Sequence, residues 1–307
     1  MKSERTFPAA IIMLAVISVV PATALATPDA DAARGDIQKT LGFVPGFMKL
    51  VPDLALPGAW MDMKGLQLNP ATALPGKMKE LVGLAVSAQI PCEYCIYAHT
   101  EFAKLNGATD AEISEAVAMG ALTRRWSTFL NGIQTDEGKF RGEISQLVTN
   151  MQKSGASGAT PPKAITVVDG KTALDDVKQS FGLVPEFLRR YPQEGLAGAW
   201  TEMRDLEMNP STAIPGKYKT LIGLAVAAQI PCKFCIIADT EFAKLEGSSD
   251  RELTEAVAMA GMVRHWSTIL NGRQADKAAF KKDISHLVAG AKKHMAMQKP
   301  EATTAAK

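Results

Sequence analysis

The chain contains an internal duplication, and this feature limits its fold more than any other. Residues 41–132 align with residues 181–272 without a gap, and more than half of the aligned positions are identical. Both copies keep short landmarks such as "GAW", which ends at Trp60 and at Trp200. A repeat of this length and similarity indicates a duplicated domain, so we expect both copies to take the same fold.

Composition marks the ends of the two copies. The stretch "TNMQKSGASGATPP" between them is rich in Gly, Ser, Thr and Pro, which is typical of a linker. The last residues are rich in Lys, Ala and Thr, as expected of a flexible tail. We therefore predict domains over residues 33–150 and 165–290, a linker over 151–164 and a tail over 291–307.

The N-terminal residues are typical of an export signal. Lys2 and Arg5 precede an apolar run over residues 9–20, and the sequence "ALA" ending at Ala26 fits a signal-peptidase site. The run is shorter than the roughly 20 residues that a membrane-spanning helix needs. We expect a signal peptide over residues 1–26, a periplasmic or secreted mature protein, and no membrane anchor after cleavage.

Charge argues against nucleic acid as a partner. The 34 Lys and Arg residues nearly balance the 32 Asp and Glu residues, for a formal net charge of +2. Aromatic residues make up only 6% of the chain, which gives little surface for stacking on bases.

Sequence patterns predict an all-α fold of antiparallel helix hairpins. "GKMKELVGLAVSAQI" is rich in Ala and Leu, contains no proline, and follows Pro75, which suits a helix start. Capping boxes open a later helix in each copy, from Thr109 to Glu112 and from Ser249 to Glu252. Alternation with period two, typical of strands, is absent.

The first copy carries three reactive side chains at helical spacing. Cys92, Cys95 and His99 stand at i, i+3 and i+7, which places them within about 60° of one another around a helix axis. If the preceding helix folds back against this one, Glu80 lies level with His99. We therefore predict that Glu80 and His99 meet across the hairpin.

This arrangement suits thiol chemistry. The thiolate is the nucleophile, and a helix N-terminus and a nearby imidazolium both stabilise it. Glu80 would orient His99, as the third member does in any set of nucleophile, base and orienting group. The candidate catalytic residues are Cys92, Cys95, His99 and Glu80.

The second copy keeps the cysteines and loses the partners. Cys232 and Cys235 repeat the CxxC pair, but Thr220 and Asp239 stand where the first copy has its glutamate and histidine. A carboxylate one turn after Cys235 would disfavour a thiolate. We expect this copy to be structural or accessory.

Two other interpretations of the cysteines remain open. Disulfides persist in exported proteins, so either CxxC pair could be a static crosslink. Four cysteines in two pairs could also bind one zinc ion. Unbroken helical sequence follows each pair where a zinc knuckle has turns, so we expect no metal and no cofactor.

The segment from Glu80 to His99 resembles the carboxymuconolactone decarboxylase superfamily, and within it the alkyl hydroperoxidase D (AhpD)-like branch. The pattern of that branch is a glutamate, eleven residues, CxxC, three residues and a histidine, which Glu80, Cys92, Cys95 and His99 match in full. The resemblance covers most of both copies. It implies two tandem AhpD-like helical domains that associate further, here as a trimer of double domains.

The resemblance also implies an activity. AhpD-like proteins are peroxidases or disulfide reductases without haem or metal, in which one cysteine attacks a hydroperoxide and its neighbour closes the disulfide. Glutamate and histidine act as a proton relay. Which cysteine attacks first is left open.

Two departures from the prototype matter. Its second histidine, between the cysteines, is replaced by Tyr94 in the first copy and Phe234 in the second. Its cytosolic reductant would not be available after export, so the thiol electron donor is unknown.

The sequence thus predicts an exported thiol-dependent peroxidase or thiol-disulfide oxidoreductase that acts on hydroperoxides. One alternative is a non-catalytic module that binds a ligand or partner and has static disulfides. Another is a lactone decarboxylase, which is less favoured because that branch does not rely on CxxC.

Overall fold

The computed structural model describes residues 29–156 and 165–298. The predicted signal peptide, the second half of the predicted linker and the end of the tail lie outside the described residues. Within those residues the chain is helical and contains no β-strand, which confirms the all-α prediction.

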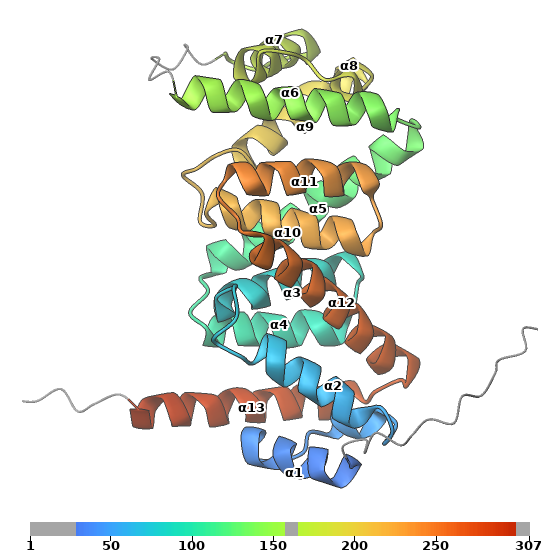
Figure 1. The fold of residues 1–307 in the computed structure, drawn as a ribbon, viewed down its shortest axis with the longest axis vertical. Helices are drawn as coiled ribbons and strands as arrows, with labels where there is room; N and C mark the ends of the chain where they lie inside the picture. Colours follow the sequence, from blue (N-terminus) through green and yellow to red (C-terminus); the bar gives the residue numbers. More distant parts are fainter. Residues whose placement is uncertain (1–28, 157–164, 299–307) are drawn as a thin grey trace, which may run out of the picture.

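Each repeat contributes a similar series of helices, drawn in Figure 1. The first repeat contains α1 (Ala30–Leu41), the 3₁₀ helix η1 (Gly46–Leu50), α2 (Leu56–Asp62), the π-helical turn η2 (Met63–Gln67), α3 (Gly76–Gln89), α4 (Glu93–Leu105), α5 (Asp110–Gly132) and α6 (Glu137–Ala156). The second repeat contains α7 (Gly170–Phe181), α8 (Glu186–Arg189), α9 (Gln193–Leu206), α10 (Gly216–Gln229), α11 (Lys233–Leu245), α12 (Asp250–Gly272) and α13 (Lys277–Gln298).

Local sequence accounts for how the long helices begin. α5 and α12 open with the predicted capping boxes. In α5 the Thr109 hydroxyl accepts a hydrogen bond from the Glu112 amide at 3.2 Å, and the Glu112 carboxylate accepts one from the Thr109 amide at 2.8 Å. Each box satisfies two backbone donors that the first turn leaves without a partner inside the helix.

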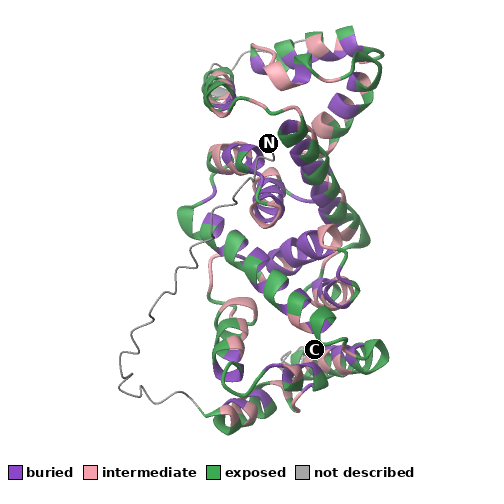
Figure 2. Cartoon of the chain, turned by 90° about the vertical axis from the view of Figure 1, so that its right-hand side faces the viewer, coloured by how far each residue is buried: buried purple, intermediate pink, exposed green. Residues whose placement is uncertain are grey.

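The core is a four-helix arrangement at the centre of the molecule. α3 and α10 pack against each other, and each also packs on both α5 and α12. Every residue from Met78 to Ser87 in α3 is buried, including the polar residues Lys79, Glu80 and Ser87. Figure 2 shows these central helices as largely buried.

The last helix of each repeat packs on the other repeat. α6 lies against α11, and α13 lies against α4, at opposite ends of the stack in Figure 1. Equivalent contacts hold both: Lys277 pairs with Glu93 at 2.5 Å, and Lys233 pairs with Glu137 at 3.0 Å. The two repeats are therefore intertwined, and each CxxC helix is covered by a helix from the other copy.

These two helices also continue beyond the predicted domain ends. α6 runs to Ala156, and α13 runs to Gln298. Helix thus extends into the first residues predicted as linker and as tail. Among the described helices, none is both long and apolar enough to cross a bilayer.

Candidate active site

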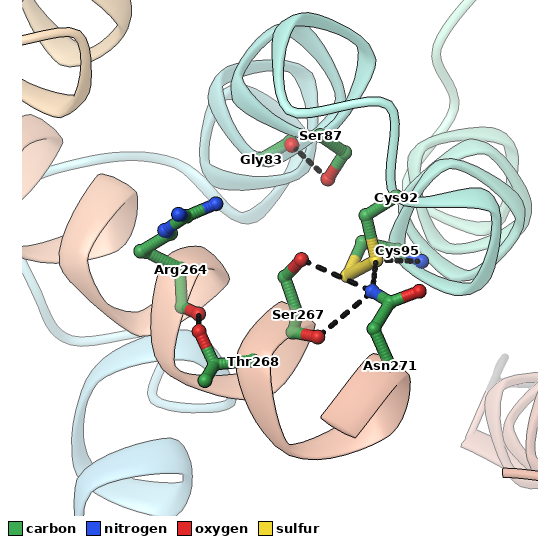
Figure 3. Close-up of a disulfide and its surroundings, with 8 residues drawn as sticks. All are labelled: Gly83, Ser87, Cys92, Cys95, Arg264, Ser267, Thr268 and Asn271. Carbon is green, nitrogen blue, oxygen red and sulfur yellow. Dashed lines mark hydrogen bonds between the residues drawn. A yellow bond between two sulfur atoms is a disulfide. The ribbon is translucent and has the colours of Figure 1, made fainter. Parts of the chain in front are cut away.

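The α3–α4 hairpin presents the two cysteines of the first copy at the start of α4. Cys92 is the N-cap residue, and its sulfur accepts a hydrogen bond from the Cys95 amide at 3.3 Å. The two residues form a disulfide, drawn in Figure 3. Both are buried, with Cys92 1% exposed and Cys95 4% exposed. The N-terminal position places the helix dipole on the Cys92 sulfur, where it stabilises a thiolate.

Glu80 and His99 meet across the hairpin, as expected. His99 Nδ1 lies 2.7 Å from Glu80 Oε2, and both side chains are buried. The other carboxylate oxygen, Oε1, accepts a hydrogen bond from Gln67 Nε2 at 3.0 Å. Gln67 ends the π-helical turn η2, and π-helical turns are frequent at functional sites. The site therefore contains a chain of three side chains, Gln67, Glu80 and His99.

Gly83 makes room for the imidazole. A Cβ atom at this position would lie 2.5 Å from His99 Nδ1 and 2.8 Å from Nε2, far inside van der Waals contact. The ring consequently lies against the backbone of α3, level with Glu80. Any side chain at position 83 would push the imidazole out of this place.

One residue of the first site comes from the second repeat. Asn271, near the end of α12, donates a hydrogen bond from Nδ2 to Cys92 Sγ at 3.5 Å. Ser267 holds the same amide group through its backbone oxygen at 2.8 Å and its hydroxyl at 3.3 Å, as Figure 3 shows. Two N–H groups, from Asn271 and Cys95, thus point at the Cys92 sulfur.

A cavity of about 740 Å³ opens beside this site. Cys95, His99 and Glu80 line it, whereas Cys92 does not. Both repeats supply its apolar walls, which include Phe47, Phe102, Met262, Trp266, Phe280 and Leu287. Within the CxxC pair, Cys95 is therefore the sulfur that a molecule in the cavity would meet.

The second copy repeats the cysteine geometry. Cys232 and Cys235 form a disulfide, and the Cys232 sulfur accepts from the Cys235 amide at 3.3 Å. Asn131 of the first repeat donates to Cys232 Sγ at 3.6 Å, as Asn271 does to Cys92. The cavity beside this site measures about 180 Å³, far smaller than the first.

The second site differs from the first at the positions of Gln67, Glu80 and His99. Thr220 donates its hydroxyl hydrogen bond to its own helix, at the Lys217 carbonyl 2.8 Å away. Asp239 stands in the place of the histidine, and Glu207 in the place of Gln67. Glu207, Thr220, Asp239 and Cys235 all line the small cavity.

Burial changes the charge expected at Asp239. Its pKa is raised well above the ordinary value, first because burial penalises the carboxylate and then because Glu207 repels it. The sequence prediction assumed a carboxylate that would disfavour a thiolate on Cys235. In the structure burial favours the protonated acid, which weakens this repulsion.

Comparison with known families identifies the fold. The profile described as the carboxymuconolactone decarboxylase family matches residues 55–135 and 194–278, together more than half of the chain. The chain belongs to the carboxymuconolactone decarboxylase family. Neither the search of curated proteins nor that of solved structures found a match.

The family match coincides with the duplicated part of the chain. Each matched segment holds one CxxC pair and the helix before it. α6 and nearly all of α13 fall outside the matches, although these helices close the sites. Among the described residues, no cluster of three or more His, Cys, Asp or Glu side chains could hold a metal ion.

Four of these site residues belong to no motif that the sequence shows: Asn271, Asn131, Gln67 and Glu207. Asn271 and Asn131 are identical in the two copies, like many other positions, so nothing in their pattern sets them apart. Gln67 differs from Glu207, and this difference accompanies those at Glu80 and His99. The joint change of three positions is the signal that could have identified Gln67.

Proposed function

We propose that this protein is a thiol-dependent peroxidase of the AhpD-like branch, with Cys95 as the attacking sulfur. The observation that carries the proposal is the placement of Cys95, His99 and Glu80 on one cavity, with His99 and Glu80 2.7 Å apart. A nucleophile, a base and a group that orients the base are what peroxide reduction by a thiol requires.

The reaction follows from the position of each group. His99 takes the proton of the Cys95 thiol, and the thiolate attacks one peroxide oxygen. The O–O bond breaks, the alkoxide leaves and takes a proton from His99, and Cys95 becomes a sulfenic acid. The Cys92 thiolate, held by Asn271 and the Cys95 amide, then attacks the Cys95 sulfur. The hydroxide that leaves the Cys95 sulfur takes up the proton that the Cys92 thiol lost, and the disulfide forms, so that one hydroperoxide and two thiols give an alcohol, water and a disulfide.

The cavity supports bulky apolar hydroperoxides as substrates. Its volume of about 740 Å³ is within the range of small-molecule sites, and its walls are aromatic and aliphatic. An external thiol would return the disulfide to the reduced state. We also propose that the protein acts outside the cytoplasm and that its chains associate with one another. Both statements are predictions from the sequence.

The relay can be tested by substitution of its two members. His99→Ala should lower the rate of cumene hydroperoxide reduction by roughly 10² to 10⁴, the usual contribution of a positioned acid-base group. Glu80→Gln should cost less, because the imidazole stays in place without its orienting charge. The measurement is single-turnover loss of thiols in the reduced protein after one equivalent of peroxide.

A matched control removes a histidine elsewhere. His265 is exposed and lines neither cavity, so His265→Ala should react at the unmodified rate. If the reduced protein loses no thiols with peroxide at all, the non-catalytic alternative with static disulfides is correct. If His99→Ala reacts as fast as His265→Ala, the histidine has no part in the reaction.

Gly83 offers an independent test of the imidazole's position. Gly83→Ala should lower peroxide reduction nearly as much as His99→Ala, because the new methyl group takes the space of the ring. Gly223→Ala is the matched change in the second copy, where the added Cβ would lie 3.0 Å from Asp239, and it should leave peroxide reduction at the first site unchanged. Equal activity of the two variants would show that the ring position is unimportant.

A further inference from the structure

The second CxxC site contains acid-base groups of its own. Glu207 ends the helix that precedes the core, Asp239 lies one turn after Cys235 on α11, and both line the same cavity as Cys235. Asp239 is 7% exposed. Helices α5 and α6 of the first repeat close the cavity with apolar residues, including Trp126, Phe140 and Ile144. The carboxyl groups therefore share a largely apolar chamber with one sulfur.

Two buried polar atoms of the lining residues have no hydrogen-bond partner within the described chain. These are Asp239 Oδ2 and Trp126 Nε1. Thr220 does not serve Asp239, because its hydroxyl donates to the Lys217 carbonyl. A buried polar atom without a partner is costly, so these two atoms indicate a place for a bound molecule.

We propose that the second CxxC is a thiol-disulfide exchange site in its own right, in which the Glu207–Asp239 carboxyl pair moves the protons and a small apolar thiol is the substrate. This inference does not depend on peroxide reduction at the first site. It replaces the expectation that the second copy is only structural or accessory.

The charges near the pair suit this role. Burial raises the pKa of Glu207 to about 7, with Lys219 opposing the rise. The pKa of Asp239 is raised well above its ordinary value, first by burial and then by Glu207, which favours its protonated form. Glu207, with a pKa of about 7, gains and loses a proton near neutral pH. Glu246 also lines the cavity, and Lys219 is held by backbone carbonyls of Leu206 and Asn209. The α5 and α6 residues that line the cavity are uncharged, and Glu115 of α5 lies 3.9 Å from Lys219 Nζ, where it offsets part of the Lys219 charge.

A specific residue of the site can carry out each step of the thiol-disulfide exchange. The Glu207 carboxylate takes the proton of an incoming thiol, and the new thiolate attacks Cys235 Sγ, which faces the cavity. The S–S bond breaks, and Cys232 leaves as a thiolate that Asn131 and the Cys235 amide stabilise. A second thiol gives its proton to the Cys232 thiolate and attacks the substrate sulfur of the mixed disulfide. The S–S bond to Cys235 breaks, and the Cys235 thiolate takes the proton from Glu207. Two thiols thus become one substrate disulfide, and the CxxC pair is reduced.

The cavity limits which thiols can enter. A volume of about 180 Å³ accepts a molecule close to benzene in size. The apolar walls and the acidic groups both disfavour an anion. Neutral thiols such as benzyl mercaptan should fit, whereas 2-mercaptoethanesulfonate, which carries a permanent negative charge, should be rejected.

The test follows reduction of each disulfide separately in the oxidised protein, by quenching, alkylation and peptide mass spectrometry. Benzyl mercaptan should reduce the Cys232–Cys235 pair at least about tenfold faster than 2-mercaptoethanesulfonate at equal thiolate concentration. The rate should rise through pH 7 as Glu207 loses its proton, and this contribution should then level off. At higher pH the rate should rise again, because the substrate thiol itself loses its proton.

Glu207→Gln provides the matched variant, because Gln is the residue of the first copy at this position. It should lower the rate at pH 7 by about 10² and remove the rise through pH 7. Asp239→Asn should also lower the rate, and far-ultraviolet circular dichroism checks that both variants fold. A wild-type second disulfide that resists benzyl mercaptan would overturn the proposal. So would an unchanged pH profile in folded Glu207→Gln.

Discussion

Cys95→Ser should reduce peroxide consumption to the rate of a protein-free solution, whereas Cys92→Ser should still complete the first chemical step. The difference follows from the cavity, which Cys95 lines and Cys92 does not. Without Cys92 the sulfenic acid on Cys95 has no neighbouring thiol to close the disulfide, so it should accumulate. Trapping with dimedone after one equivalent of cumene hydroperoxide, followed by mass spectrometry, measures it directly.

The second copy supplies the control for this experiment. Cys232→Ser and Cys235→Ser remove the corresponding sulfurs and should leave peroxide consumption at the first site intact. A dimedone adduct on Cys92 in the Cys95→Ser protein would reverse the assignment of the attacking sulfur. No adduct on any cysteine, together with full peroxide consumption, would place the chemistry outside the CxxC pairs.

Local features of this site could be predicted from the sequence because they depend on short stretches of chain. Pro75 and the capping box at Thr109 set where two helices start, and helical spacing placed the cysteines beside His99. The contact of Glu80 with His99 needed only one further assumption, that consecutive helices fold back on each other. The 2.7 Å contact agrees with it.

The exchange of helices between repeats could not be predicted in this way. Whether α13 packs on its own repeat or on the other depends on contacts more than a hundred residues apart. An example is the hydrogen bond from Tyr94 to the Ala275 carbonyl at 2.6 Å. A duplicated chain offers two similar surfaces to each helix, and sequence periodicity is the same for both. Asn271 contacts Cys92 only because the two repeats are intertwined, so this contact could not be predicted from the sequence either.

The raised pKa of Asp239 in the second site could not be predicted from the sequence either. Asp239 was interpreted from its neighbours in the chain, and on that basis it is an ordinary carboxylate. Its pKa depends on burial and on Glu207, which lies more than thirty residues away in sequence. Only the fold shows that the two carboxyl groups share a cavity.

Converting the second site into a copy of the first should raise its rate of peroxide reduction by orders of magnitude. The required changes are Thr220→Glu, Asp239→His and Glu207→Gln, made in a Cys92→Ser/Cys95→Ser background so that any turnover belongs to Cys235. The backbone of the second copy can accommodate these side chains, because Gly223 leaves the same space that Gly83 leaves for His99. Asn131 already contacts Cys232. We expect the reduced triple variant to react about 10² to 10⁴ faster than the unmodified second site.

The third substitution separates this design from one based on the sequence motif alone. With only Thr220→Glu and Asp239→His, Glu207 would remain beside the new glutamate, and two carboxyl groups on one cavity would compete for one proton. Gln67 instead donates a hydrogen bond to Glu80. The double variant should therefore be slower than the triple.

The small cavity sets which peroxide the triple variant can use. Hydrogen peroxide should enter a space of about 180 Å³, and cumene hydroperoxide should not, whereas the first site accepts both. The triple variant should also lose the exchange with benzyl mercaptan, since it lacks both carboxyl groups of the pair. A folded triple variant that reacts with hydrogen peroxide no faster than the unmodified second site would show that Gln67, Glu80 and His99 are not what distinguishes the two copies. If that variant gains peroxide reduction and keeps the exchange, the first assignment stands and the carboxyl pair has no role in moving protons.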